Sequence, residues 1–332
     1  MGQYWKITNI DKAQTIGNEG GLKVKEILIN GVAEPLVDLL KVPRLRRYKF
    51  TDAAVAAARL KNTSSRLVAL PQELIDAITA VVENDVDIIC LALTSSYFFR
   101  LLAPAVTEAV IRDEAPWAGD RIICVGDYAN GAPAGLFTDD ELAEITARCP
   151  MESEHYLGAD GVTIETRQSE EDKEFAMRNP LYSMETQVVN DAVSDNAVIA
   201  DRNPIRRRRN DPVQRVRRLR NRRLSVDEMQ MLDRLLHPSH QTPRQEVILR
   251  NLTTKEYVLD SAVAGQVNAY GLGEVLCTHT QWGEGSSHDQ RLRRKEGEWA
   301  GCRFDIATMR EVDGSWTDVS EKALRELGYW AW

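Results

Sequence analysis

The chain has 332 residues, a hydrophobic content of 43% and a formal net charge of −8. That length and apolar content suffice for about two domains with buried cores. The acidic balance excludes a protein whose whole surface binds nucleic acid or an anionic membrane. No stretch approaches the roughly 18 apolar residues of a membrane helix, and the start of the chain lacks the basic and apolar regions of a signal peptide.

The five cysteines are an odd number at wide spacings, and none belongs to a Cys-x-x-Cys motif. Such usage favours buried free thiols in a reducing compartment over a disulfide framework. We therefore expect a protein of the cytoplasm, the nucleus or both.

The first part of the chain predicts strands followed by helices. Residues 3–10 are aromatic and β-branched, which is typical of a strand. Residues 22–29 alternate apolar and polar side chains and predict a second strand. Residues 33–40 predict a short helix, and the alanine-rich segment 51–60 predicts another.

Residues 70–102 predict short helices that follow one another closely. Pro71 suits the first turn of a helix, where its missing N–H is not needed. Asn84 and Asp85 interrupt the pattern and can cap a second helix, and Ser95-Ser96 interrupts it again before a third apolar run. The first helix carries one apolar stripe, formed by Leu74, Ile75, Ile78 and Val82. Helices this short must pack on one another and on a further surface.

The order of residues in this stretch resembles the F-box, the helical motif through which substrate receptors dock on cullin-RING ubiquitin ligases. The likeness spans residues 66–105, opening with Leu70-Pro71-Gln72-Glu73-Leu74 and closing with Leu91-Ala92-Leu93-Thr94-Ser95-Ser96-Tyr97-Phe98. It departs at Tyr97-Phe98-Phe99, where F-boxes often have a basic residue and a tryptophan. The resemblance implies a docking surface for a Skp-type adaptor, made by Leu70, Pro71, Leu74, Ile78, Ile88 and Leu91. The alternative is a plain helical subdomain that packs into the chain's own core.

Residues 117–127 predict a turn and a buried strand, and their first five residues have a later echo. Trp117-Ala118-Gly119-Asp120-Arg121 and Trp299-Ala300-Gly301-Cys302-Arg303 differ only at the fourth residue, and both precede a strand-like run. One interpretation is a shared device that starts a strand: glycine makes the turn, tryptophan covers the core edge and arginine faces a carboxylate, with Asp127 and Asp305 as local candidates. The other is a duplicated half-domain.

Residues 151–223 are predicted to be a disordered or loosely ordered insertion, which follows a helix opened by a capping box at Thr138 and Glu141. Within it, the segment 201–223 contains eleven arginines and two aspartates. This basic segment can pair with the acidic segment 152–174, act as an import signal or bind nucleic acid. For the protein as a whole we expect no nucleic-acid partner.

The last part of the chain is predicted to return to strands. A capping box at Ser225 and Glu228 opens a helix to about Leu236. Strands are expected at residues 246–251, 256–260 and 303–309, and an amphipathic helix at 319–327.

Several blocks outside the helical stretch resemble a group of proteins from filamentous fungi. The blocks are Gly2-Gln3-Tyr4-Trp5-Lys6, Trp117-Ala118-Gly119-Asp120-Arg121, Val125-Gly126-Asp127-Tyr128 and the run from Arg250 to Val258. In some members of that group an F-box-like segment lies between the first two blocks, as it does here. The group has no established reaction, so the resemblance implies a domain layout and no mechanism.

Candidate ligand-binding residues gather around the repeated motif. Aspartate, arginine and glycine at strand ends can bind a small polar molecule, although they equally form salt bridges and turns, and tryptophans are more often core residues. The candidates are Trp117, Asp120, Arg121, Asp127, Tyr128, Trp299 and Arg303.

Signals for metal binding or catalysis are weak. His237 and His240 have the spacing of a metal pair, but Pro238 breaks the helix that would aim both rings. No standard zinc module matches the spacing of Cys277, His279, His288 and Cys302. No nucleophile or paired-carboxylate motif stands out, so we expect no metal, no cofactor and no catalysis.

These patterns predict an α+β protein in which a three-helix F-box-like unit is inserted into a mostly β domain. The predicted parts are the β domain at 1–50, 113–150 and 224–332, the helical unit at 51–112 and the charged insertion at 151–223. The expected function is that of a substrate receptor, which binds a Skp-type adaptor, and through it a cullin ligase, while the β domain presents a substrate protein. The alternative is a small-molecule-binding or enzymatic β domain with the helices as scaffold.

Overall fold

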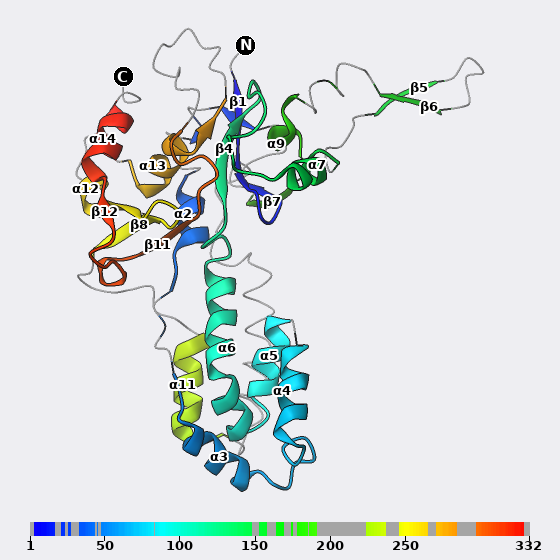
Figure 1. Cartoon of the computed structure of the whole chain (residues 1–332), viewed down its shortest axis with the longest axis vertical. Coiled ribbons are helices and arrows are strands. Elements are labelled where there is room, and N and C mark those ends of the chain that lie inside the picture. Colours follow the sequence, from blue (N-terminus) through cyan, green and yellow to red (C-terminus); the bar gives the residue numbers. More distant parts are fainter. Residues whose placement is uncertain are drawn as a thin grey trace. The chain divides into compact units, whose positions relative to one another are not determined.

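A computed structural model of the chain has an α+β fold and divides into two compact units (Figure 1). Unit 1 comprises residues 1–41, 117–195 and 245–332, and unit 2 comprises residues 42–116 and 196–244. The structure describes residues 3–16, 21–23, 26–27, 33–43, 45, 48–82, 84–147, 153–157, 164–168, 174, 178–184, 186–190, 224–236, 246–264, 270–283 and 297–328.

Unit 1 is built on two sheets whose strands come from separate parts of the chain. The first sheet has the strand order β10-β4-β1-β2-β7, with β3 paired to β1, and the second has the order β11-β8-β9-β12. The strands of the first sheet are β1 (Tyr4–Asn9), β2 (Gln14–Ile16), β3 (Leu22–Lys23), β4 (Ile122–Gly126), β7 (Gln187–Asn190) and β10 (Gln281–Trp282). Those of the second are β8 (Val247–Asn251), β9 (Glu256–Leu259), β11 (Phe304–Thr308) and β12 (Thr317–Asp318). A separate hairpin pairs β5 (Ser153–Leu157) with β6 (Ile164–Gln168).

The helices described in unit 1 are α2 (Glu34–Leu40), α7 (Asp139–Ala147), α9 (Pro180–Ser183), α12 (Asp260–Ala264), α13 (Leu272–His279) and α14 (Ser320–Gly328), with a 3₁₀ helix, η3 (Met309–Glu311). Helix α13 is buried along nearly its whole length. A Cβ atom at Gly273 would lie 2.2 Å from the carbonyl oxygen of Ala33, so a glycine lets α13 approach the start of α2 closely.

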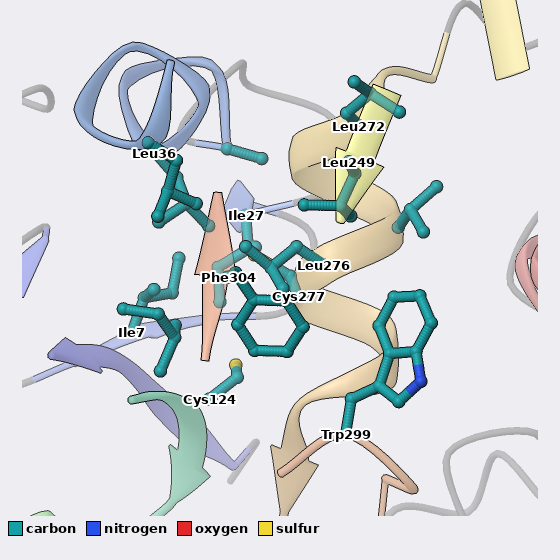
Figure 2. Packing of buried hydrophobic residues seen from close by; sticks show 14 of the residues in the cluster. Ile7, Ile27, Leu36, Cys124, Leu249, Leu272, Leu276, Cys277, Trp299 and Phe304 are labelled. Carbon is teal, nitrogen blue, oxygen red and sulfur yellow. The ribbon is translucent and has the colours of Figure 1, made fainter. Parts of the chain in front are cut away.

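Strand β4 is apolar throughout because both of its faces are buried. Alternate side chains of a strand point to opposite faces. Ile122 and Cys124 belong to the main core of unit 1, whereas Ile123 and Val125 belong to a smaller cluster formed with residues of α7 and α9. Figure 2 shows the main core, in which Cys124 of β4 and Ile7 of β1 lie near Phe304 of the second sheet and residues of α13.

The two Trp-Ala-Gly-x-Arg segments pair with each other in an antiparallel bridge. The backbone N–H of Gly119 donates to the carbonyl oxygen of Phe304 (2.7 Å), and that of Gly301 donates to the carbonyl oxygen of Ile122 (2.9 Å). Both glycines have positive φ, +85° and +74°, which glycine adopts without steric cost. Each segment therefore donates an equivalent hydrogen bond to the other, as expected for two segments related by a two-fold axis.

The same relation extends to the hairpins that precede each segment. In the first hairpin Asn9 pairs with Gln14, and in the second Asn251 pairs with Glu256. The indole N–H of Trp117 donates to Gln14 Oε1 (2.8 Å), and that of Trp299 donates to Glu256 Oε2 (2.8 Å). The residues just before these acceptors, Ala13 and Lys255, both have positive φ.

Two further pairs of contacts repeat in the same way. The backbone N–H of Trp117 donates to the carbonyl oxygen of Leu39 and that of Trp299 to the carbonyl oxygen of His279, each at 3.0 Å. Strands β7 and β12 add in parallel to β2 and β9, through hydrogen bonds of 2.9 Å from Gln187 to Ala13 and from Thr317 to Lys255. Unit 1 therefore contains the same arrangement twice, which favours the duplicated half-domain over an isolated strand-start device.

Unit 2 is a bundle of helices around one long helix, α6. The helices described in it are α3 (Asp52–Lys61), α4 (Gln72–Ala80), α5 (Asp85–Ala92), α6 (Ser96–Glu114) and α11 (Val226–Leu236). Helix α6 packs against α3, α5 and α11. Its first turn brings Tyr97, Phe98 and Phe99 into the core, each at most 2% exposed.

Several predicted boundaries are corrected by the structure. Residues 180–183 and 187–190, predicted to lie in a disordered insertion, form α9 and β7, and Leu181 and Met184 are buried there. Helix α11, predicted to belong to the β domain, packs in unit 2 because Glu228 accepts hydrogen bonds from Ser96 and Arg100 of α6. The strand predicted at 22–29 ends at Lys23, and residues 26–27 are helical. Residues 191–223, which hold the arginine-rich segment, lie outside the described residues.

Among the described helices, none combines the length and the apolar character that crossing a membrane requires.

Candidate functional site

Helix α4 begins one residue after Pro71, which the sequence placed in the first turn of the helix. Pro71 is extended and occupies the position before the first helical residue, Gln72. Four residues after the end of α4 at Ala80, Asn84 caps α5, since its side-chain oxygen accepts a hydrogen bond of 2.9 Å from the backbone N–H of Val86. Ser95 caps α6 in the same way through the N–H of Phe98 (3.3 Å).

Polar contacts fix the start of α4 to the rest of unit 2. The Arg59 guanidinium of α3 donates to the carbonyl oxygens of Val68 and Leu70 and to Gln72 Oε1. The Tyr97 hydroxyl of α6 donates to the same Gln72 oxygen at 2.8 Å. These hydrogen bonds hold the start of α4 by its backbone and by a polar side chain, so its apolar side chains are not needed for attachment there.

Helix α4 presents an exposed apolar stripe, which we call the α4 stripe and define as Pro71, Leu74, Ile78 and Val81. The exposed fractions of Leu74, Ile78 and Val81 are 51%, 36% and 75%. By contrast, Ile75, which lies next to this stripe around the helix, is 1% exposed and is the one buried residue of the helix. An apolar row of this kind on a helix that has already buried its core side is typical of an interaction surface.

The six residues expected to form an adaptor-docking surface fall into two groups. Pro71, Leu74 and Ile78 are exposed, as docking requires. The other three, Leu70, Ile88 and Leu91, are partly buried and pack against the core of unit 2. Val81 was missed by sequence reasoning, although its position three residues after Ile78 extends the same helical face.

Helices α4 and α5 also expose charged and polar side chains. Glu73, Asp76 and Asp87 are exposed on α4 and α5. The Cys90 thiol of α5 is also exposed, and its pKa is raised by partial burial and then by the negative charge of Asp87. A thiol with a raised pKa holds little thiolate at neutral pH, so Cys90 is not suited to nucleophilic chemistry. Exposed apolar side chains together with charged ones on the same helix, as on α4, are a composition that protein–protein interfaces share.

Most of the candidate ligand-binding residues have structural partners within unit 1. The side chains of Arg121 and Arg303 both bind Asp11, at 2.7 and 2.8 Å, so neither uses its expected local partner, Asp127 or Asp305. Asp120 accepts hydrogen bonds of 2.8 Å from Asn9 Nδ2 and 2.7 Å from Lys12 Nζ. Trp117 and Trp299 are buried and donate to Gln14 and Glu256 respectively, as described above.

Asp127 and Tyr128 lie apart from that cluster, at the opposite end of β4. They are the two central residues of a tight turn closed by the N–H of Ala129 and the carbonyl oxygen of Gly126 (3.0 Å). Desolvation by burial raises the pKa of the Asp127 carboxyl, although backbone N–H groups partly offset that effect. The structure therefore separates these two candidates from Trp117, Asp120, Arg121, Trp299 and Arg303.

No group of three or more histidine, cysteine or acidic residues in the described part of the chain is placed to hold a metal ion. Of the residues considered for a metal, His237, His240 and His288 lie outside the described residues. Cys277 is buried in the main core, and burial raises the pKa of its thiol well above the usual value. Comparisons of the chain with protein-family models, with curated proteins and with solved structures find no match.

Proposed function

We propose that this protein is an F-box-type substrate receptor, in which unit 2 docks on a Skp-type adaptor and unit 1 carries a substrate protein to a cullin ligase. The proposal rests on the α4 stripe, because it combines the F-box-like order of residues 70–98 with apolar side chains left exposed at Leu74, Ile78 and Val81. A helical subdomain serving only as scaffold would bury these side chains.

The internal arrangement of unit 2 supports the same proposal. Tyr97-Phe98-Phe99, the point at which the chain departs from the F-box pattern, is buried in the core of unit 2. The departure therefore alters the packing of the bundle and leaves the α4 stripe unchanged. In addition, Leu74, Ile78 and Val81 are exposed and contribute little to the packing of unit 2. Apolar side chains of that kind can serve as anchors for a partner.

The proposal is tested by mixing the purified full chain with a purified Skp-type adaptor and measuring the mass of the product by size-exclusion chromatography with light scattering. We expect a complex with one copy of each protein. An adaptor that elutes separately at micromolar concentrations of both proteins contradicts the proposal, since folded F-box receptors must bind the adaptor before they reach the ligase.

A further inference from the structure

A buried amide in the second half of unit 1 has an unused hydrogen-bond donor. Asn251 is 0% exposed, and in the described part of the chain its Nδ2 atom has no hydrogen-bond partner. Its Oδ1 atom is in use, since it accepts the backbone N–H groups of Thr253 and Thr254 at 3.0 and 3.2 Å. These two hydrogen bonds fix the orientation of the side chain. A buried donor without an acceptor is costly, and few such groups occur in native proteins.

The equivalent amide in the first half has an acceptor. Asn9 occupies the position of Asn251 in the first hairpin. Its Oδ1 atom accepts the backbone N–H of Lys12 (3.1 Å), which corresponds to the N–H of Thr254 in the second half. Its Nδ2 atom donates to Asp120 Oδ2 at 2.8 Å. The two asparagines therefore have the same orientation, and the duplication shows where the acceptor for Asn251 belongs.

Cys302 lies where the first half has Asp120. Each is the fourth residue of the repeated motif, and their backbone N–H groups donate to the carbonyl oxygens of Trp299 and Trp117, at 3.0 and 3.1 Å respectively. The Nδ2 atom of Asn251 is thus directed toward the side chain of Cys302. A thiol sulfur is only a weak acceptor, and it takes the place of the carboxylate carbon, one bond short of the accepting oxygen. The missing acceptor is therefore one oxygen atom attached to this sulfur.

Cys302 differs from the other described cysteines in having side-chain donors beside its sulfur. Burial raises the pKa of its thiol, the side chains of Asn251 and Thr253 oppose that rise because they stabilise negative charge on the sulfur, and the charge of Glu256 adds to it. At the other three described cysteines no side-chain donor opposes the rise in pKa. Cys302 is also partly exposed, so small solutes can approach it.

The charges around Cys302 favour a neutral acceptor over an anionic one. In the first half, the Lys12 ammonium pairs with Asp120 at 2.7 Å. The second half has Thr254 in place of that lysine and has the charge of Glu256 nearby. An anion at position 302 would therefore lack a cationic partner and be repelled. A protonated sulfenic acid is neutral, and its oxygen lies two bonds from Cβ, as the carboxylate oxygen of aspartate does.

We propose that Cys302 is a modification site at which a hydroperoxide oxidises the thiol to a sulfenic acid. The sulfur attacks one peroxide oxygen, and the S–O bond forms as the O–O bond breaks. With hydrogen peroxide, the departing hydroxide takes up the thiol proton and leaves as water, so sulfur loses two electrons and the peroxide gains them. The new oxygen accepts the hydrogen bond from Asn251 Nδ2.

Two chemical properties follow from this assignment. The thiolate is the reacting form, so the oxidation is slow at neutral pH and accelerates in alkaline solution. Thiols reduce sulfenic acids, so the modification is reversible. Oxidation thus adds one hydrogen bond between the second Trp-Ala-Gly-x-Arg segment and the hairpin of β8 and β9, and reduction removes it.

The first test treats the reduced full chain with hydrogen peroxide in mildly alkaline solution and then with dimedone, which alkylates sulfenic acids. Peptide mass spectrometry locates the adduct. We expect the adduct at Cys302 in preference to Cys90, although Cys90 is exposed, and no adduct when dithiothreitol is added before dimedone. An adduct at Cys90 with Cys302 unmodified overturns the proposal.

Thermal unfolding tests the hydrogen bond itself, with the Cys90→Ser variant used to confine the reaction. We expect oxidation to raise the melting temperature of unit 1 by roughly 2–4 °C, the shift for one restored buried hydrogen bond in a domain of this size. Dithiothreitol should reverse the rise. A protein that carries the sulfenic acid at Cys302 and melts no higher than the reduced protein contradicts the proposal.

The matched variants are Cys302→Asn and Cys302→Leu. Their side chains have nearly the same shape, but only asparagine offers an oxygen in the accepting position. We expect Cys302→Asn to melt at the higher temperature, and peroxide to raise the melting temperature of neither variant. Equal melting temperatures of the two variants count against the assigned acceptor position.

This proposal does not rest on adaptor docking, because Cys302 belongs to unit 1. Peroxide treatment of the Cys90→Ser variant should leave adaptor binding unchanged. The double variant Leu74→Asp with Ile78→Asp should form the dimedone adduct at Cys302 as the wild type does. Failure of either experiment therefore contradicts only the proposal to which it belongs.

Discussion

A protein carrying Leu74→Asp together with Ile78→Asp is expected to remain folded and to lose adaptor binding. Both side chains lie on the α4 stripe and are exposed. Exposed substitutions usually change the free energy of unfolding by about 0.5 kcal/mol or less each, and aspartate in a helix adds about 0.7 kcal/mol at most. On docking, however, two carboxylates would lose water without a cationic partner, which costs several kcal/mol. We expect the dissociation constant to rise by roughly a thousandfold or more, equivalent to about 4 kcal/mol.

The control for this variant is Leu60→Asp together with Val226→Asp. Both residues are exposed in unit 2, and the charge change is the same. The positions also match: Val226 and Leu74 lie in the first turns of their helices, and Leu60 and Ile78 lie near the ends. Calorimetric titration of the adaptor should show wild-type affinity for the control. If both double variants bind equally well, or both fail, the α4 stripe is not the docking surface.

Replacing Trp117 or Trp299 by alanine is expected to unfold unit 1 or to lower its melting temperature by about 10 °C or more. Removing a buried tryptophan side chain costs about 3–5 kcal/mol, and it also leaves Gln14 or Glu256 without its indole donor, which adds about 1 kcal/mol or more. Domains have a free energy of unfolding of only about 5–15 kcal/mol. Because the two tryptophans make equivalent contacts in the two halves, the losses should agree within about 1 kcal/mol, allowing for the usual scatter of core substitutions.

The comparison variant is Trp316→Ala. This tryptophan is partly exposed and stacks on the Arg250 guanidinium, 5.3 Å from its ring centroid, so its removal should cost much less. Thermal unfolding followed by circular dichroism separates the cases. Stable Trp117→Ala and Trp299→Ala proteins would show that these residues do not support the core, and loss of a bound small molecule in such proteins would favour the ligand-binding alternative.

The elements that sequence reasoning predicted correctly depend on neighbours close in the chain. The capping box at Thr138 is present, with the N–H of Glu141 donating to the Thr138 hydroxyl (3.2 Å) and Glu141 accepting from the Thr138 N–H (3.0 Å). Strands β8 and β9 form where they were predicted, because the residue pattern of each strand is a local feature, and they pair with each other. Such patterns specify a conformation without reference to the rest of the fold.

The elements that were missed depend on distant partners. Helix α13 is buried on nearly every side, so its sequence has no polar face to reveal a helical period. Strand β7 is short and is defined by its pairing with β2. The amphipathic pattern of α11 predicts a helix but not the surface on which it packs, and that surface is set by Ser96 and Arg100, more than a hundred residues earlier.

The candidate site shows the same division. The helical spacing of its apolar residues predicted α4. It did not predict which of these residues are buried, because that depends on the packing of Ile75 in the core of unit 2. The common partner of Arg121 and Arg303 could not be predicted, because Asp11 is brought to both of them by the pairing of the two halves.

Hydrogen–deuterium exchange of the full chain, measured with and without the Skp-type adaptor, tests adaptor docking by the α4 stripe most directly. Free α4 contributes one fully buried side chain to the core, so its amides should exchange faster than those of α6, which contributes many. With saturating adaptor, we expect strong new protection in residues 71–82 and unchanged exchange in the strands of unit 1. Adaptor binding that protects another part of the chain, with α4 exchanging as fast as before, would contradict it.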